Sequence, residues 1–314
     1  MEISASQNRR YFVMAPIILF VYKRLKHTQE VIRALQQCDG ARESELYIYS
    51  DAAQKPEEEI QVNALRNYLD TIDGFKKVHI TKRAQNHGLA HNIINGISEV
   101  INKYQKLIVL EDDIICAPQF LSYMNEALEK YEDKEDIFSI SGYHPHVKSP
   151  GQVSASVYKN YRSSSWGWAT WADRWNKVDW EVSDHKEFFK SKGKRQAFNK
   201  GGEDLSWMLW KQIHGLLDSW AIRFCYAQFK NKAYTVFPVE SLVTNTGFDG
   251  SGKHSEITSK FYVQPKGDNI NLNLPENPEV NIYLMKKFRK YYKLPFKKKV
   301  KKVLLMDMLN GWNR

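Results

Sequence analysis

The feature that most constrains the fold is an alternation, through the first 140 residues, of short apolar runs with amphipathic helical patterns. The apolar runs occupy residues 17–22, 46–50, 77–80, 107–110 and 137–140, and the helical patterns occupy 28–37 (capped by Thr28), 57–70, 89–104 and 118–130. Unbroken apolar runs of this length are typical of strands covered on both faces, and helices between them form βαβ units. We therefore predict an α/β protein with a mostly parallel central sheet flanked by helices, in which a ligand binds beyond the carboxyl ends of the strands.

The basic residues are unevenly distributed. The chain has 46 Lys and Arg against 36 Asp and Glu, a net charge of +10, and ten basic residues with no acidic one lie between positions 280 and 306. The rest of the chain is formally balanced, so nucleic-acid binding over the whole surface is not expected. The basic tail is amphipathic, which suits the surface of an anionic bilayer. A solvated tail without a partner and a tail that binds nucleic acid are the alternatives.

Cysteine usage and hydropathy bear on the compartment. Cys38, Cys116 and Cys225 are unclustered, and no pair has metal-ligand spacing. The first ten residues contain no apolar segment of the kind found in signal peptides, and no apolar stretch reaches the roughly 18 residues of a membrane-spanning helix. We expect a cytoplasmic protein that its basic tail holds peripherally on the inner face of the cell membrane.

The sharpest local signal is the acidic triplet Glu111-Asp112-Asp113, which directly follows the apolar run 107–110. Three carboxylates at the end of a buried strand repel one another and lose hydration. A hard cation such as Mn²⁺ or Mg²⁺, bound by these oxygens and by those of a nucleotide diphosphate, would remove that cost. The alternative is a solvated loop whose acids stabilise the N-terminus of the next helix.

Charged and polar residues follow three other predicted strands. Arg24 and Asp51 come after the first and second strands, at the same sheet edge as Asp113, where they could contact a nucleotide base; surface charge is the alternative. The segment 83–92 follows the third strand and opens a helix. There Gly88 permits close approach of a ligand and the helix N-terminus favours anionic groups, although an ordinary left-handed turn would have the same sequence.

Tryptophan is concentrated in one region, since eight of the nine fall between positions 166 and 220. Trp168, Trp171 and Trp175 have i, i+3, i+7 spacing, which predicts the buried face of a helix. Trp166 lies in a Ser/Gly segment, and its indole face suits a sugar ring. We therefore place an acceptor or sugar site at Trp166, with its neighbours Gly167 and Trp168.

The general base is less clear from local patterns. Asp204 and Asp218 each precede a helical pattern, near 203–215 and 218–230, where an N-cap is the usual role of Asp. His254 lies in a Gly-rich segment and is a candidate metal ligand or phosphate contact, or has no role.

Taken together, these segments resemble the nucleotide-sugar glycosyltransferases of the GT-A fold, and most closely the bacterial family 2-like sugar transferases, which are related in pattern to N-acetylglucosaminyltransferase I. Four segments carry the resemblance in the family's order, at 83–92, 107–124, 163–175 and the pair 219–229 and 237–255. The resemblance implies a GT-A domain over 1–260, with a nucleotide-binding part at about 15–140 and an acceptor-side part at about 141–260. A linker and the basic amphipathic tail follow over 261–314.

The resemblance also implies roles for individual residues. Asp113 would hold the Mn²⁺ or Mg²⁺ ion that bridges the donor diphosphate, although the triplet reads EDD and not Asp-x-Asp. Related enzymes place a catalytic Asp near position 221, which is Ala221 here, and we favour the nearby Asp218 over Asp204 as the base. The residues expected to contact the donor nucleotide are Arg24, Asp51, Arg83, Asn86, Gly88, Glu111 and Asp112.

The implied activity is inverting, metal-dependent transfer of a sugar, with GlcNAc-type sugars among the candidates, from a UDP-linked donor to a saccharide hydroxyl in bacterial surface glycan synthesis. A lipid-linked saccharide acceptor would make membrane attachment useful. One alternative is a sugar nucleotidyltransferase, which should carry a Gly-rich loop after the first strand, where residues 21–28 have no glycine. The other is a non-catalytic carbohydrate-binding protein, which would not need the acidic triplet.

Overall fold

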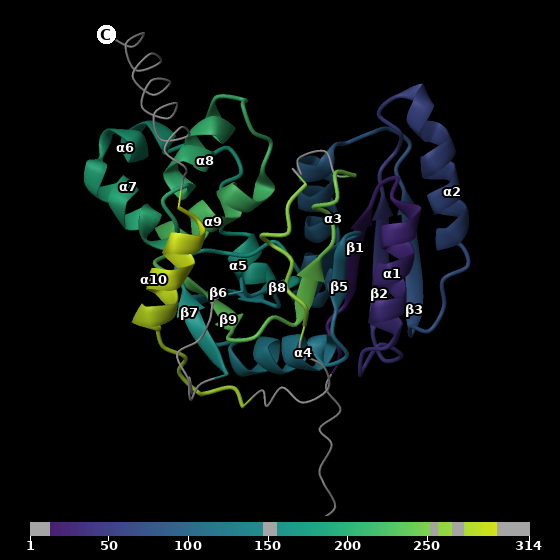
Figure 1. Ribbon diagram of the computed structural model, residues 1–314, viewed down its shortest axis with the longest axis horizontal. Coiled ribbons are helices and arrows are strands. Elements are labelled where there is room, and N and C mark those ends of the chain that lie inside the picture. Colours follow the sequence, from purple (N-terminus) through teal and green to yellow (C-terminus); the bar gives the residue numbers. More distant parts are fainter. Residues whose placement is uncertain (1–12, 147–155, 252–256, 266–272, 294–314) are drawn as a thin grey trace, which may run out of the picture.

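An eight-stranded sheet runs through the computed structural model, which describes residues 13–146, 156–251, 257–265 and 273–293. The strand order across the sheet is β3 (Lys77–Lys82), β2 (Glu45–Ser50), β1 (Ile17–Val21), β4 (Lys106–Glu111), β8 (Trp168–Trp171), β6 (Ile137–Ser141), β9 (Tyr234–Pro238) and β7 (Val157–Asn160) (Figure 1). The first four strands in this order are parallel, and β6 pairs in parallel with β9. Only β8 and β7 run antiparallel to their neighbours in the sheet. The predicted mostly parallel sheet is confirmed.

Helices cover both faces of the sheet. α1 (Leu25–Gln36), α2 (Glu59–Leu69) and α4 (Phe120–Lys130) pack on one face, and α3 (Leu89–Tyr104), α5 (Ala172–Trp175) and α9 (Trp220–Lys230) pack on the other. Alternate residues of β1 enter the two cores, with Leu19 on the first face and Ile18 and Phe20 on the second. This double coverage explains why the strand sequences are apolar without a break.

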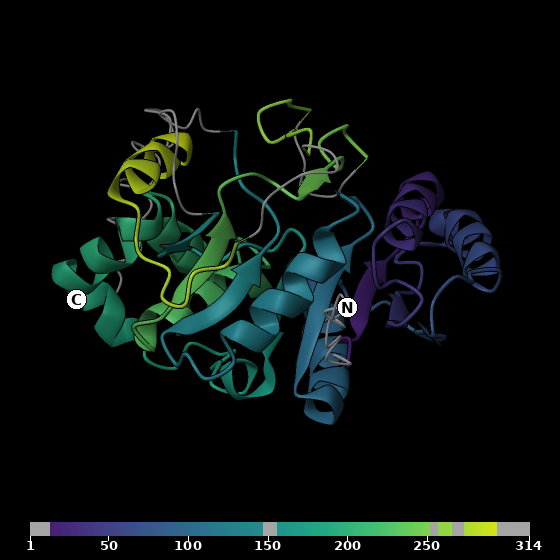
Figure 2. The ribbon, with the colours of Figure 1, turned by 90° about the horizontal axis from the view of Figure 1, so that it is seen from below.

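The remaining described helices lie toward the end of the sheet that carries β9 and β7. These are α6 (His185–Lys190), α7 (Lys192–Phe198), the 3-10 turn η2 (Asn199–Gly201), α8 (Leu205–Ile213) and α10 (Ile282–Tyr291), while a further 3-10 turn, η1 (Pro56–Glu58), precedes α2. Seen from below, the yellow α10 lies at this end of the molecule, away from α1 and α2 (Figure 2). It packs through Leu284, Met285 and Phe288 against Tyr158 of β7 and Phe237 of β9. The rest of the predicted basic tail, residues 294–314, lies outside the described residues.

A second, two-stranded sheet brings a distant segment to the carboxyl edge of β4. β5 (Ile114–Cys116) follows the acidic triplet and pairs antiparallel with β10 (Val243–Asn245). Residues that follow Asn245 are therefore carried to the carboxylates at 111–113.

Two local predictions were wrong. The segment containing Trp168 and Trp171 is the central strand β8, whose residues are buried on both faces, so a spacing of three does not indicate a helix there. α1 begins at Leu25, one turn before the predicted cap, and the Thr28 hydroxyl donates to the Arg24 carbonyl at 3.0 Å.

Within the described residues, none of the helices combines the length and the apolar character needed to cross a bilayer.

Candidate active site

The acidic triplet forms the turn between β4 and β5. Glu111 is the last residue of β4, and the preceding strand residues are almost fully buried, so the turn begins inside the protein. Burial, together with the negative charges of Asp113 and Asp112, raises the pKa of Glu111 to about 8, although the Arg24 cation acts in the opposite direction. Burial also raises the pKa of Asp112. This turn therefore concentrates negative charge that the protein does not fully compensate.

Arg24 partly compensates the negative charge of the acidic turn. Its guanidinium donates from Nε to Asp112 Oδ2 at 3.2 Å and from Nη2 to Asp113 Oδ2 at 2.9 Å, with a further Nη2 contact to Asp112 Oδ1. Burial alone would lower the pKa of Arg24, but the two carboxylates raise it above its ordinary value. One cation against three acidic side chains leaves the turn with a formal charge of about −2 when all are ionised. The residue predicted to contact a nucleotide base thus binds the acidic turn in this structure.

The segment after β10 closes over Asp113. The Thr246 backbone N–H and hydroxyl donate to the Asp113 carbonyl at 2.9 and 3.2 Å. A methyl group placed on Gly247 would lie 2.0 Å from Asp113 Oδ2 and 3.1 Å from Arg24 Nη1, so only glycine allows the backbone this close. Residues 245–248 lie within the segment 237–255 that carries the family resemblance, but no local pattern indicates this contact.

The donor set of the turn fits a hard divalent cation. In the described part of the chain, no group of three or more His, Cys, Asp or Glu side chains is arranged to hold a metal by itself. The turn offers carboxylate oxygens and a residual charge that a divalent ion would neutralise, which suits Mg²⁺ or Mn²⁺ with further oxygens from a diphosphate. The other candidate ligand, His254, lies outside the described residues.

The loops after β2 and β3 are joined through Asp51. Its carboxylate accepts the backbone N–H groups of His87 at 2.9 Å and Gly88 at 3.0 Å, and Asn86 Nδ2 donates to the Ala52 carbonyl at 2.6 Å. Gly88 has φ +73° and ψ 160°, which is not a left-handed helical turn, and nothing lies within 4 Å of the position of a Cβ. Open space is therefore left beside the N-terminus of α3, as a ligand would require.

Arg83 faces α3. Its Nε donates to Asn92 Oδ1 at 3.2 Å, its Nη2 pairs with Glu99 at 3.2 Å, and its guanidinium lies 5.0 Å from the centre of the Tyr49 ring. These contacts hold α3 against β2 and engage the guanidinium of Arg83 with both elements.

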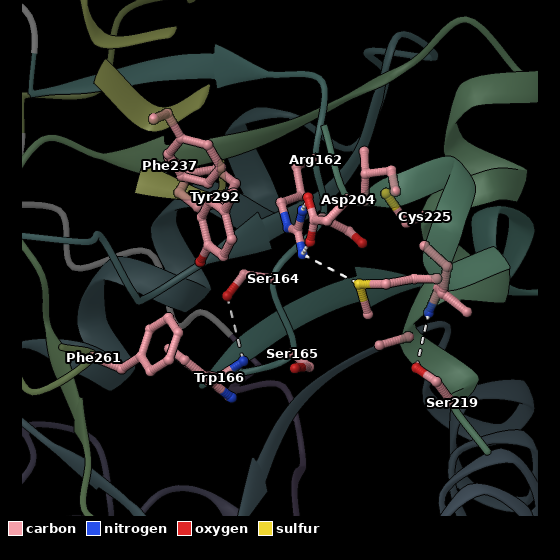
Figure 3. Close-up of a pocket in the computed structure, with 16 residues that line it drawn as sticks. Arg162, Ser164, Ser165, Trp166, Asp204, Ser219, Cys225, Phe237, Phe261 and Tyr292 are labelled. Carbon is pink, nitrogen blue, oxygen red and sulfur yellow. Dashed lines mark hydrogen bonds and ion pairs between the residues drawn. The ribbon is translucent and has the colours of Figure 1, made fainter. Parts of the chain in front are cut away.

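A cavity of about 340 Å³ lies beside the Trp166 segment (Figure 3). One wall is formed by Ser163, Ser164 and Ser165, and the lining is completed by Arg162, Trp166, Asp204, Leu205, Met208, Ser219, Ala221, Ile222, Cys225, Phe237, Phe261, Phe288 and Tyr292. Hydroxyls facing aromatic rings suit a saccharide, whose C–H faces pack on rings while its hydroxyls form hydrogen bonds.

Trp166 connects this cavity with the acidic turn. Its ring lies 5.6 Å from that of Phe248, which follows Gly247, and 4.5 Å from that of Tyr143. Gly167 packs against β10, since a Cβ there would lie 2.8 Å from Val243 Cγ1. Trp168, by contrast, is fully buried and stacks on Trp220 at 5.0 Å, so it does not line the cavity.

The two candidate bases have different environments. Asp204 lines the cavity, makes no helix-capping hydrogen bond, and accepts from both terminal nitrogens of Arg162 at 2.8 and 3.0 Å. The Asp218 side chain is 56% exposed, does not line the cavity, and has Arg223 Nη2 at 3.7 Å. The N-cap of α9 is Ser219, whose hydroxyl accepts from the Ile222 N–H. Asp204 therefore occupies the N-cap position of α8 without capping it through its side chain, Asp218 precedes the N-cap of α9, and of the two only Asp204 lines the cavity.

The sequence matches one protein family. The model of glycosyl transferase family 2 matches residues 17–200, which is more than half of the chain and includes β1 to α7. No curated protein sequence gives a significant match.

The chain also resembles several solved structures at low sequence identity. One is TarS from S. aureus, with 10% identity, a TM-score of 0.40, and a match that covers 74% of this chain and 37% of that chain. Another is the mannosyltransferase PcManGT from Pyrobaculum calidifontis in complex with GDP-Man and Mn²⁺, with 12% identity, a TM-score of 0.34, and a match that covers 52% of this chain and 49% of that chain. A third is the galactosyltransferase LgtC in complex with donor and acceptor sugar analogs, with 10% identity, a TM-score of 0.36, and a match that covers 70% of this chain and 72% of that chain. The present chain thus spans little more than a third of the length of TarS. Likenesses at this level do not identify a substrate, and the family assignment depends on the sequence match over residues 17–200.

Proposed function

The chain belongs to glycosyl transferase family 2, and from that premise we propose that it transfers a hexosyl or N-acetylhexosaminyl group from a UDP-linked donor to a saccharide hydroxyl, with inversion at the anomeric carbon. The observation that carries the proposal is the acidic turn at 111–113, which Arg24 and Gly247 enclose at the carboxyl edge of the sheet. Trp166 connects it to a cavity with the surface chemistry of a sugar site.

The acidic turn is the proposed site of the donor's diphosphate. Asp113 would hold a Mn²⁺ or Mg²⁺ ion there, with Glu111 and Asp112 beside it. When bound, the ion supplies Lewis-acid stabilisation of the charge on the leaving nucleoside diphosphate. Arg24 holds Asp112 and Asp113 in place, and the open space beside Gly88 would let an anionic ligand approach the N-terminus of α3, where the helix dipole favours negative charge.

Asp204 is the proposed general base. Both of its oxygens bond to Arg162 but keep lone pairs that can accept another proton. As the bond between the anomeric carbon and the diphosphate oxygen breaks, the acceptor oxygen forms the new glycosidic bond and its proton passes to the Asp204 carboxylate. Attack from the face opposite the leaving group gives inversion without a covalent intermediate. We prefer Asp204 to Asp218 because only the former lines the cavity.

Membrane attachment is proposed through α10 and the basic segment that continues it. Lys286, Lys287, Arg289 and Lys290 are exposed on this helix, while Phe288 faces the core. Vesicles that contain phosphatidylglycerol should bind the chain better than phosphatidylcholine vesicles do, and replacement of the four cations by Gln should reduce that difference. Equal sedimentation of both proteins with anionic vesicles would refute α10 as the anchor. A lipid-linked acceptor in surface glycan synthesis would then lie beside the cavity.

A panel of nucleotide sugars tests the proposed activity. With Mn²⁺ present and the nucleotide sugar at about 100 times its Kd, a UDP-sugar should raise the melting temperature by several degrees. Chelation or Asp113→Asn should remove most of this shift and the hydrolysis of the donor measured without acceptor. The exposed Asp173→Asn is the matched control and should behave as the wild type. Undiminished stabilisation and hydrolysis in both the chelated protein and Asp113→Asn would refute the proposal.

A further inference from the structure

α10 forms part of the cavity wall although it lies outside the part of the chain that the family model matches. Phe288 from the helix and Tyr292, which directly follows it, line the cavity together with Phe237. Phe288 is almost fully buried, and its ring centre lies 5.5 Å from that of Phe237. The family match ends at residue 200. Phe237, Phe288 and Tyr292 therefore form an aromatic wall that lies outside the family segment, whereas Trp166 lies within it.

A chain of direct contacts joins this helix to Asp204. Arg162 binds both oxygens of Asp204, and the centre of its guanidinium lies 4.1 Å from the centre of the Tyr292 ring. Figure 3 shows Arg162 between the carboxylate and the ring. A third contact, from Arg162 Nη2 to Met208 Sδ at 3.8 Å, fixes the guanidinium on the side of α8. The Arg162 guanidinium is thus held between Asp204 at the start of α8 and the ring of Tyr292 at the end of α10.

The contacts leave little room for rearrangement. A methyl group on Gly202 would lie 2.5 Å from Asp204 Oδ1, 2.7 Å from Arg162 Nη1 and 3.6 Å from Tyr292 Cβ. Arg162 and Asp204 are each only 13% exposed at the side chain. A planar guanidinium with both ends engaged has few alternative positions, so displacement of the ring would loosen the carboxylate as well.

Building on the assignment of Asp204 as the base, we propose that Arg162 and Tyr292 are positioning residues that hold the Asp204 carboxylate in the acceptor cavity. The docked helix α10 is then part of the acceptor site and restricts which saccharides fit it. In the undocked state the carboxylate would lose its orientation, whereas the acidic turn that receives the donor would be unaffected.

Substitutions at Tyr292 separate this role from a general effect on folding. Tyr292→Leu removes the aromatic face, Tyr292→Phe keeps it, and Ile282→Ala, on an exposed position of the same helix, is the control. The probes are UDP-GlcNAc first and then the other nucleotide sugars with Mn²⁺ as donors, and p-nitrophenyl glycosides as acceptors. We expect Tyr292→Leu to lower kcat for transfer about tenfold while donor KM and acceptor-independent donor hydrolysis stay within twofold. Tyr292→Phe should keep at least half of the wild-type rate. Wild-type transfer by the Leu variant, or parallel loss of transfer and hydrolysis, would overturn the proposal.

A second measurement does not depend on any substrate. In the full chain, Arg162→Met and Tyr292→Leu should each speed hydrogen exchange of the α10 amides at least fivefold, and the double variant should exchange little faster than either single one. If the double variant instead shows the product of the two single rate increases, Arg162 and Tyr292 do not act together, and the proposed positioning role is overturned. If the wild type turns over no donor and acceptor pair, the proposed function fails, but the exchange experiment still decides whether Arg162 and Tyr292 hold α10 together.

Discussion

Asp113 and Gly247 are in direct contact, with the position of a Cβ on Gly247 only 2.0 Å from Asp113 Oδ2. The pairing of β5 with β10 produces this contact, because it places Asn245 opposite Ile114 and leads the next residues over the turn. The Asn245 side chain then accepts the Gly247 N–H at 2.8 Å and fixes the local backbone. The acidic turn is thus enclosed by the segment after β10, which lies more than 130 residues later in the sequence.

Gly247→Ala should impair the acidic turn while leaving the fold intact. The added methyl would displace the Asp113 carboxylate or the backbone over it, and Arg24 would shift with it. We expect the affinity for UDP in the presence of Mn²⁺, measured by calorimetry, to fall at least tenfold.

The control for this change is Gly193→Ala on α7, where the nearest atom to the new Cβ is Ser191 Oγ at 3.9 Å. It should bind UDP as the wild type does. Wild-type affinity in Gly247→Ala, with an unchanged circular dichroism spectrum, would show that the contact does not shape the site.

Neutralising the two candidate bases should give opposite results. Asp204→Asn keeps the shape of the side chain but cannot take a proton, so transfer should fall at least about 100-fold. Asp218→Asn changes an exposed group that does not line the cavity, and transfer should stay within about threefold. Both rates are measured at saturating donor, with donor affinity determined separately. A large loss in Asp218→Asn alone would return the role of base to that residue.

The sequence was sufficient to predict the parallel half of the sheet and the position of the acidic turn, because both depend on local sequence patterns. The apolar runs that became β1 and β4 are continuous, and the triplet at 111–113 follows β4 without a gap. Trp171 was correctly predicted as a core residue, whereas Trp168 was placed both in the core and at the sugar site, and only its core position is correct. Both were assigned to a helix, since a strand buried on both faces has no period by which to recognise it. The contact of Arg162 with Tyr292 could not be predicted, because it depends on where α10 docks.

Trp166 and Trp168 should respond differently to truncation although only one residue separates them. Trp166 is partly exposed at the cavity, so Trp166→Ala should raise the KM for the acceptor severalfold with little effect on donor binding. Trp168 is fully buried against Trp220, so Trp168→Ala should lower the free energy of unfolding by about 3–5 kcal/mol. Thermal unfolding and acceptor titration of both variants provide the comparison. Equal effects on stability would contradict the assignment of Trp166 to the cavity.

His144 should make the protein less stable in mild acid. The residue is 4% exposed beside Tyr158, and burial lowers its pKa from 6.5 to about 4. The unfolded chain therefore binds a proton between these pH values and the folded protein does not, so the free energy of unfolding falls as the pH decreases through this interval. The full difference in pKa corresponds to a loss of about 3 kcal/mol.

Denaturant unfolding of His144→Gln at pH 7, 5.5 and 4.5 isolates this contribution. The variant will be less stable than the wild type at pH 7, because the packed ring is lost, but its stability should decline less steeply with acidification. His91→Gln on α3 is the control, since His91 is exposed and its replacement should leave the slope unchanged. If His144→Gln and the wild type lose stability in parallel from pH 7 to 4.5, then His144 is not held neutral by its burial, and the acid sensitivity of the protein originates in other groups.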